Sequence, residues 1–508
     1  MQTENKTIDF VSTLQSWMNL AVDKLNNTST FIVLCILFCG NFLTFIPDGN
    51  EENYLQLSKQ FLDPNWIFNS FSLTEFPGTR VIYQYVCGFA LQYISFEVLT
   101  FTGRFLIIVW FSFVLASLLK KIQLTNIYSL FLFQIVFFIQ QSTFGGENFL
   151  LGFESKHIAY GFVLLALNTF YDKKYFKTVL FIVCASWFHI LVGGWLFLAF
   201  ALYLLFDRKV SFKQVCIMGG VYGALLLPFV WYLVSEIVFH ASTIQAGVSA
   251  DWIYSYYRNP HHTGIFYSID YFYDNHAIGV LWSMIIGCIT AVVYPKILRS
   301  DLLHVNKLVF IISCILFVNV VLAFFDREGH FVKYYPFRLG SIQLFLFYLL
   351  TCSIIASYFT RQESFQSIFL LTVVAFFGIA VLLNVYKMAR FIKKDGKPFY
   401  QMAAYIKQHT PKDAVIYYSD KAEDYSLSFI RVSERDRFVV YKFVPAGTDK
   451  IYKWYDRILL QEKIDKDPSA IMEAKKNYKI DYVLTTDSLG FAGVKEIKRI
   501  EEFRLYEF

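Results

Sequence analysis

The sequence predicts an α-helical, multi-pass membrane protein that ends in a small soluble α/β domain. Its 508 residues are 56% hydrophobic and only 17% charged, with a mean hydropathy of +0.44, which is too apolar for a soluble protein of this length. Apolar runs long enough to cross a bilayer recur between residues 31 and 386. From about Pro398 the composition becomes that of an ordinary soluble domain. The apolar runs predict about eleven transmembrane helices.

The chain begins with a polar segment, residues 1–29, that lacks the apolar core of a cleavable signal peptide, so we expect the first helix to stay in place. The orientation derived below makes this segment cytoplasmic. The long apolar run Phe176 to Phe206 is interrupted near His189 and Gly193, which predicts two helices that meet at a turn. The other predicted crossings are Phe31–Phe45, Phe105–Leu119, Leu124–Ile139, His157–Phe170, Phe212–Ile237, Ala277–Val293, Leu308–Phe324, Leu339–Tyr358 and Ile368–Tyr386.

Lysine and arginine residues in the short connections set the predicted orientation. Five basic clusters, at residues 120–121, 173–177, 208–213, 296–299 and 361, all become cytoplasmic if the apolar stretch Val81 to Phe96 dips into the outer surface without crossing. The transmembrane domain, residues 30–397, then has outer loops at 47–101, 140–156, 238–276 and 325–338. A basic segment after the last helix conflicts with this orientation, because it would lie on the outer side; contact with lipid phosphates would relieve the conflict. Its residues are Lys387, Arg390, Lys393, Lys394 and Lys397.

The last segment, residues 398–508, is predicted to form a periplasmic α/β domain of about 110 residues. Its pattern predicts helices at Phe399–Gln408, Lys450–Gln461 and Pro468–Tyr478, and strands at Ala414–Tyr418, Phe438–Tyr441 and Asp481–Thr485.

Several classes of function are disfavoured. All eight cysteines lie in apolar segments, without a disulfide framework or zinc spacing. The chain has no glycine-rich nucleotide fingerprint, which argues against a nucleotide-sugar or ATP site, and we expect no nucleic-acid partner. It has no internal repeat of the kind that transporters show.

The stretch Pro47 to Tyr54 directly follows the first apolar run and carries three carboxylates, Asp48, Glu51 and Glu52. Acidic groups at the mouth of a membrane helix can bind a cation, act as a general base, or be solvated where the chain leaves the lipid. The group gains interest because other polar clusters are predicted on the same side of the membrane.

The second outer loop contains Glu147, Glu154, Lys156 and His157, more ionisable residues than a connector at the lipid surface needs. Glu154 and His157 share a face if a helix begins there, whereas the alternative is a helix cap with a solvated salt bridge. His189 is a lone ionisable group in an apolar run, so it either hydrogen-bonds a neighbouring helix or serves the function.

The third and fourth outer loops add further candidates. His261 and His262 are potential metal ligands, but adjacent histidines do not easily face one ion without a third ligand, so an aromatic interfacial loop accounts better for this tyrosine-rich region. Arg338 begins a membrane helix, where its charge calls for an anion. A phosphate or pyrophosphate headgroup and a carboxylate of the chain itself are the two alternatives.

The layout of the chain resembles that of membrane glycosyltransferases of the GT-C architecture. The shared features are an acidic cluster after the first helix, a long first outer loop, many further crossings and an outer α/β domain. The acidic motif Asp-Gly-Asn-Glu-Glu-Asn-Tyr at 48–54 only approximates the paired acidic motif of those enzymes. The segments at 153–160, 410–414, 437–445 and 454–458 are more closely similar to a little-characterised bacterial family of GT-C-like proteins.

The resemblance implies a sugar or oligosaccharide donor on polyprenyl phosphate or pyrophosphate, transferred at the outer face of a bacterial inner membrane. Asp48 would be the base or a metal ligand, with Glu51 and Glu52 as rivals, and Glu147 or Glu154 would supply a second acidic position. Lys156, His189 and Arg338 would bind the donor phosphate, and a divalent cation such as Mg²⁺ or Mn²⁺ is compatible with the site.

Two other functions remain open, because a fold layout does not fix a function. The chain is alternatively a non-catalytic GT-C-like scaffold subunit of a membrane export or secretion complex, whose partners would be other membrane proteins. A transporter of lipid-linked substrates is the third interpretation.

Overall fold

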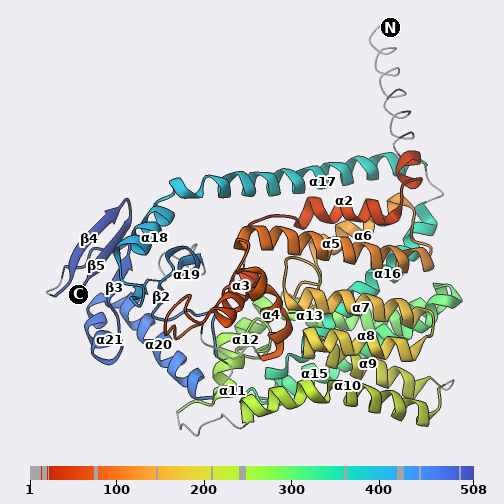
Figure 1. Cartoon of the computed structure of the whole chain (residues 1–508). Helices are drawn as coiled ribbons and strands as arrows, with labels where there is room; N and C mark the ends of the chain where they lie inside the picture. The colour runs from red at the N-terminus through yellow and green to blue at the C-terminus, as the bar shows by residue number, and fades with distance from the viewer. Residues whose placement is uncertain are drawn as a thin grey trace.

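The computed structural model describes residues 22–47, 49–73, 78–144, 147–207, 210–238, 247–359, 363–419, 428–445, 448–490 and 493–508, with residues 13, 16 and 20 before them. Most of the described chain is a bundle of long helices that lie side by side, with a small sheet domain at one end (Figure 1). The bundle helices are α2 (Thr30–Phe42), α5 (Phe96–Lys121), α6 (Ile127–Ile139), α7 (Ser155–Tyr171), α8 (Tyr175–Phe188), α9 (Ile190–Phe206), α10 (Phe212–Val238), α13 (Ala277–Cys288), α15 (Leu303–Phe325), α16 (Leu339–Phe359) and α17 (Glu363–Ile392).

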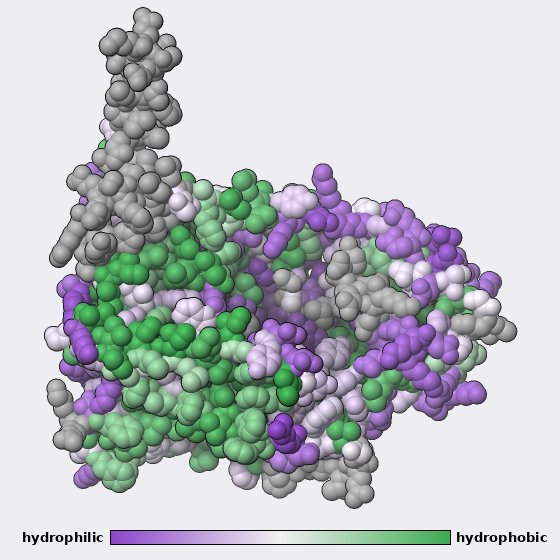
Figure 2. Space-filling model, turned by 180° about the vertical axis from the view of Figure 1, so that it is seen from behind, coloured by the Kyte–Doolittle hydropathy of each residue, from purple (hydrophilic) through white to green (hydrophobic). Residues whose placement is uncertain are grey.

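The bundle is that of a multi-pass membrane protein, as predicted. Within the described ranges, six helical segments are long and apolar enough to cross a membrane, and they include α5, α10 and α15. Shorter apolar helices, among them α2, α6, α8 and α9, pack beside them. Apolar side chains cover the outside of the bundle, and hydrophilic ones cover the sheet domain (Figure 2). The predicted break near His189 is confirmed, because α8 ends at Phe188 and α9 begins at Ile190.

The short basic connections meet at one end of the bundle. Lys121 forms an ion pair with Asp172 (2.8 Å), Tyr171 donates to Asp301 (2.7 Å), and Arg299 donates to Gln123. The long loops and the sheet domain lie together at the opposite end (Figure 1). The described connections around residues 121–123, 171–172 and 299–301 thus lie together, and which side of a membrane they face stays a prediction.

The stretch predicted to dip forms α4 (Val81–Ala90), whose ten residues span about 15 Å, half of a bilayer core. It packs against α3 (Gly49–Leu62) so closely that a Cβ on Gly88 would lie 2.2 Å from the Ser58 carbonyl oxygen. Helix α4 is thus too short to cross and lies at the end of the bundle beside the sheet domain (Figure 1).

The C-terminal domain is a five-stranded sheet with strand order β2-β1-β3-β5-β4. Strand β1 pairs in parallel with β2 and β3, and β5 runs antiparallel to β3 and β4. Its elements are α18 (Pro398–His409), β1 (Val415–Tyr418), α19 (Ser428–Ser433), β2 (Asp436–Arg437), α20 (Thr448–Lys466), α21 (Ile471–Asn477), β3 (Tyr482–Thr485), β4 (Lys495–Ile500) and β5 (Phe503–Glu507).

The prediction of a strand at Phe438–Tyr441 is wrong, because the strand in this region, β2, covers Asp436–Arg437 and ends before the predicted segment. In the buried segment after β2, side chains of α20 rather than a neighbouring strand donate hydrogen bonds to the backbone carbonyl oxygens. Arg457 donates to the Phe438 oxygen (2.8 Å) and Trp454 to the Val440 oxygen (3.1 Å). Sequence patterning also missed α19, β4 and β5. Strand β4 is a largely exposed edge strand that carries charged residues, which blunts its hydrophobic alternation.

The C-terminal domain is docked firmly on the first long loop. Arg431 of α19 donates to Glu52 of α3 (2.6 Å) and to Glu97 of α5 (3.0 Å), and Lys394 also pairs with Glu97. Leu57, Ile67 and Leu73 of the loop belong to the same buried cluster as the residues of α18 and β1. The domain therefore covers the loop end of the bundle as a fixed wall.

Candidate functional site

Helix α3 directs two consecutive carboxylates to different neighbours, because successive residues on a helix point about 100° apart. The Glu51 carboxylate accepts three hydrogen bonds from the Arg104 guanidinium, from Nε to both oxygens (3.1 and 3.2 Å) and from Nη2 to Oε2 (2.5 Å), and one from the Phe153 amide (2.7 Å). Burial raises the pKa of Glu51 against the opposing Arg104 charge. The Glu52 carboxylate instead accepts hydrogen bonds from Arg431 and Gln56. Glu51 thus lines the site, whereas Glu52 ties down the C-terminal domain.

The second loop places its acidic and basic residues around the start of α7. Glu154 occupies the N-cap position, yet its side chain makes no cap hydrogen bond. Lys156 lies 3.5 Å from Glu154 and 3.6 Å from Glu147. Because the side chain does not cap the helix, the Glu154 carboxylate is directed into the space between the loops instead.

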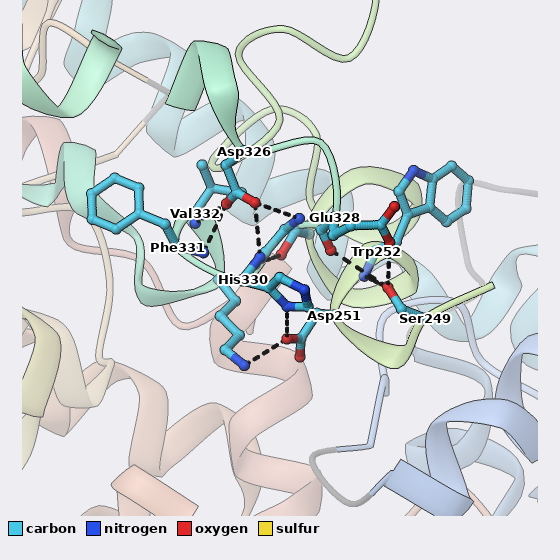
Figure 3. A network of polar contacts seen from close by, with 11 residues as sticks. Ser249, Asp251, Trp252, Asp326, Glu328, His330, Phe331 and Val332 are labelled. Atoms are coloured by element: carbon cyan, nitrogen blue, oxygen red, sulfur yellow. Dashed lines mark hydrogen bonds and ion pairs between the residues drawn. The ribbon is translucent and has the colours of Figure 1, made fainter. Parts of the chain in front are cut away.

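The fourth loop is shaped by one carboxylate at the end of α15. Both oxygens of Asp326 accept backbone N–H groups, from Gly329 and His330 on one side and from Phe331 and Val332 on the other, at 2.7–3.1 Å (Figure 3). A carboxylate held by several amides fixes the path of a turn.

The same loop is anchored to the third loop by Asp251, which pairs with His330 (2.8 Å) and Lys333 (2.6 Å), as Figure 3 shows. The chain then enters α16 through Tyr335, a residue in the left-handed region with φ of 49°. This turn presents Arg338, whose Nη1 donates to Glu147 (2.6 Å) and whose guanidinium lies 4.8 Å from the Tyr335 ring centre. The alternative that Arg338 pairs with a carboxylate of the chain is thus correct for one of its nitrogens.

His189 and the third loop complete the ring of ionisable groups. His189 sits at the junction of α8 and α9 in extended conformation, with φ of −155°. Burial lowers the pKa of His262 to about 3 and that of His261 to about 4, so both rings are neutral at physiological pH. Their ring centres are 4.0 Å apart.

These groups line one cavity of about 1070 Å³ at the loop end of the bundle. In Figure 2 it shows as a hollow with hydrophilic walls between the apolar bundle and the C-terminal domain. Its described lining contains three carboxylates, Glu51, Glu147 and Glu154, and nine lysine or arginine residues. Each carboxylate pairs with one or more of three of these cations: Arg104, Lys156 and Arg338. The other six are Arg80, Arg258, Lys387, Arg390, Lys397 and Lys442. The cavity is therefore built for anions.

The structure brings most of the sequence-predicted residues together. Eight of them line the cavity: Glu51, Glu147, Glu154, Lys156, His189, His261, His262 and Arg338. Glu52 is not among the lining residues, and His157 is fully buried, with its Nδ1 bonded to the Gly152 carbonyl oxygen (2.7 Å). Asp48 lies outside the described residues, although Ile46 and Gly49 on either side of it line the cavity.

Of the three residues considered as metal ligands, Asp48 lies outside the described residues, and Glu52 and Glu147 are each engaged by cationic side chains. Glu52 is held by Arg431 and Glu147 by Arg338 and Lys156, so guanidinium and ammonium groups occupy the oxygens that a cation needs. Among the described residues no three His, Cys, Asp or Glu side chains gather as metal ligands do. The donor set that the structure describes does not fit Mg²⁺ or Mn²⁺.

Sequence patterning overlooked several cationic residues of the cavity. Arg104 was hidden in the apolar run of α5, although a charge at that depth is itself a signal of a buried partner. Arg80 and Arg258 lie in loops with no distinguishing motif. Lys387, Arg390 and Lys397 did stand out, as a conflict with the positive-inside pattern, and the structure places all three in the cavity wall.

Several buried atoms of the cavity-lining residues have no hydrogen-bond partner in the part of the chain that the structure describes, and three of them belong to residues singled out in the sequence. These three are the Nε of Arg338, the Nδ1 of His189 and the Oε2 of Glu154. Burying such groups unpaired costs about 1–3 kcal/mol each. Arg338 and Glu154 both line the cavity, and each keeps one atom without a hydrogen bond among the described residues, although the Lys156 ammonium lies 3.5 Å from the Glu154 Oε2.

The fold is that of an α-helical membrane protein, with a cavity rich in lysine and arginine between its bundle and a C-terminal α/β domain. Residues 397–460, from Lys397 in the cavity wall to the middle of α20, match the model of a domain of unknown function, DUF6798. No curated protein matches the chain. Over 90% of its length the chain is similar to the crystal structure of the Archaeoglobus fulgidus oligosaccharyltransferase in complex with Zn and sulfate, at 12% identity and a TM-score of 0.41, covering 68% of that chain.

Proposed function

We propose that the protein is a GT-C-type glycosyltransferase of the bacterial inner membrane, which moves a sugar or oligosaccharide from a polyprenyl phosphate or pyrophosphate carrier to an acceptor on the outer side. The observation that carries the proposal is that one cavity is lined by a cationic donor, Arg338, whose Nε has no hydrogen-bond partner among the described residues, and by a carboxylate, Glu154, whose Oε2 accepts no hydrogen bond there and lies 3.5 Å from the Lys156 ammonium. Glycosyl transfer from a phosphate carrier needs both, a donor for the leaving group and an acceptor for a proton.

The reaction assigns each group a task. The acceptor hydroxyl attacks the anomeric carbon of the donor sugar, and the bond from that carbon to the phosphate oxygen breaks. The electron pair remains on the phosphate, where Arg338, Lys156 and His189 donate hydrogen bonds to the developing charge. The hydroxyl proton passes to a carboxylate, for which we propose Glu154 or Asp48.

Glu51 and Glu147 support these groups. The Arg338 and Lys156 charges outweigh burial and hold the pKa of Glu147 below its ordinary range, so this carboxylate stays ionised and orients both cations. Glu51 is held by Arg104 and the Phe153 amide, which fits a positioning residue better than a base.

The carrier lipid has an entry route beside α17. The last turns of α17 carry exposed Leu382, Leu383, Val385 and Tyr386, and the next residues, Lys387 and Arg390, line the cavity. An apolar surface that leads to cationic residues suits a polyprenyl chain with a phosphate head. The same placement relieves the conflict with the positive-inside pattern.

A binding test needs no knowledge of the sugar. Native mass spectrometry of the full-length protein would compare a polyprenyl phosphate with the polyprenol of equal length. We expect retention that depends on the phosphate and weakens about tenfold or more in Arg338→Gln, which removes a charge-assisted contact. Arg327→Gln is the matched control, because Arg327 lies in the same loop, is exposed and does not line the cavity. Equal binding of phosphate and alcohol would refute the donor site.

A transfer test separates an enzyme from a scaffold. In cells that depend on this chain, Glu154→Gln should leave the protein folded and able to bind polyprenyl phosphate, while the sugar-linked carrier accumulates because the proton acceptor is gone. Asp48→Asn is assayed in parallel to assign the base. If neither variant raises the sugar-linked carrier above the wild-type amount, the scaffold interpretation replaces the enzyme.

A further inference from the structure

The cavity holds more positive charge than one carrier phosphate uses. Nine lysine or arginine residues face three glutamates, and a phosphate or pyrophosphate ester brings only about two negative charges. Arg80, Arg258, Lys387, Arg390 and Lys397 have no carboxylate partner among the described residues. Of these five cations Arg258 is the buried one, whereas Lys387 and Arg390 are exposed, so the cost of an unneutralised charge falls mainly on Arg258.

The surplus cations divide between two walls. Lys387 and Arg390 belong to the end of α17, next to the apolar surface where a carrier lipid would arrive. Arg258 belongs to the third loop and contacts the C-terminal domain, where its Nη2 donates to the Lys442 carbonyl oxygen and its guanidinium lies 4.8 Å from the Tyr441 ring centre. The second wall therefore includes residues of the C-terminal domain.

Arg258 itself is built as a receptor for an anion. Its exposed fraction is 9%, and its Nε is buried without a hydrogen-bond partner among the residues described. The contacts that it does make are to neutral groups, Asn259, the Lys442 carbonyl oxygen and the Tyr441 ring. A guanidinium kept out of water with neutral neighbours lacks only the carboxylate or phosphate that its geometry favours.

The same wall is suited to sugar rings. Tyr254, Tyr335 and Tyr441 line the cavity together with Arg258, and Asn259 and His261 add polar edges. Aromatic faces beside hydrogen-bonding groups suit the apolar face and hydroxyl rim of a pyranose. An acidic peptide would use the charge but has no need of this set of rings.

We infer that the acceptor is an acidic glycan, whose carboxylate or phosphate groups bind at Arg258 on the domain wall while the carrier phosphate binds at Arg338, Lys156 and His189. The inference rests on the proposed function and names its second substrate class. It also gives the C-terminal domain a role, since Tyr441 and Lys442 bring that domain into the acceptor wall.

The test is a binding measurement on the full-length protein in nanodiscs, with a galacturonic acid hexamer and the neutral maltohexaose as probes. We expect the acidic hexamer to bind, to weaken as salt is raised, and to bind about tenfold more weakly to Arg258→Gln. Arg499→Gln is the matched control, an exposed arginine of β4 outside the cavity. Maltohexaose should not compete.

The outcomes are distinguishable from those of the carrier test. Equal affinity for the acidic and the neutral hexamer, or an Arg258→Gln variant with wild-type affinity for the acidic one, would overturn the inference. Binding of an acidic peptide of equal charge as tightly as the hexamer would overturn the glycan assignment. Failure of polyprenyl phosphate to bind, with the acidic hexamer still bound through Arg258, would instead refute the proposed donor.

Discussion

The Arg338–Glu147 pair tests whether the cavity is organised as described. The two side chains are 12% and 6% exposed, and their charged atoms are 2.6 Å apart. Removing one member of such a buried pair costs about 3–5 kcal/mol, because the other charge is left without its partner. Lys156 lies 3.6 Å from Glu147 and partly compensates, so we expect Arg338→Gln to cost about 3 kcal/mol, the lower end of that range.

A double-mutant cycle measures the coupling directly. The four proteins are the wild type, Arg338→Gln, Glu147→Gln and the double variant, unfolded by SDS titration in mixed micelles. We expect the double variant to be more stable than the two single losses predict, by about 2 kcal/mol, within the range of residues in contact. Additive losses would mean that the two groups do not interact, and the geometry of the site would be refuted.

The pH dependence of the same variants gives a second check. The pKa of Glu147 is lowered in the folded state, so the unfolded state binds its proton first as the pH falls. The stabilisation is therefore complete above the unfolded pKa of about 4.3 and is lost progressively below it. Wild-type stability should fall below pH 5 more steeply than that of Glu147→Gln, and parallel curves would contradict the assignment.

Three further predictions concern the architecture. Burial raises the pKa of Asp436 to about 6, so the wild-type protein should lose stability as the pH rises from about 4 to 6, and Asp436→Asn should not. Unfolding free energies of both proteins across that pH range measure this difference, and identical slopes would contradict it. Arg431→Met should destabilise the protein by about 3–5 kcal/mol by stranding Glu52, and hydrogen exchange should rise in α19, whereas unchanged exchange would show that the domain docks without this pair. Gly88→Ala should lower the unfolding temperature because its Cβ would meet the Ser58 carbonyl oxygen at 2.2 Å, while Gly219→Ala, with nothing within 4 Å, should not; equal effects would refute the α3–α4 contact.

Much of the helical architecture follows from local sequence. The apolar runs located the bundle helices, because a span of about twenty apolar residues is a strong signal that does not depend on distant contacts. Glycine placement also predicted the interruption at His189, and the distribution of lysine and arginine predicted that α4 does not cross. Strands β4 and β5 were not predicted, since an exposed charged edge strand and a short hairpin show little hydrophobic periodicity.

The site was only partly legible for a different reason. Glu147, Glu154, Lys156 and Arg338 could be chosen because ionisable residues at membrane depth are expensive and therefore informative. The roles of Glu51 and Glu52 could not be separated, because their partners, Arg104 and Arg431, are 53 and 379 residues away. Arg258 needed the C-terminal domain to be in place before its buried, carboxylate-free environment could be recognised.

The central claim is that one cavity binds the phosphate of a polyprenyl carrier. It is tested most directly by native mass spectrometry of the full-length protein with a polyprenyl phosphate and its matching polyprenol. We expect the wild-type protein to retain the polyprenyl phosphate but not the polyprenol. We expect Arg338→Gln to lose the polyprenyl phosphate and Arg327→Gln to retain it. Retention of both lipids, or loss of binding in both variants alike, would contradict it.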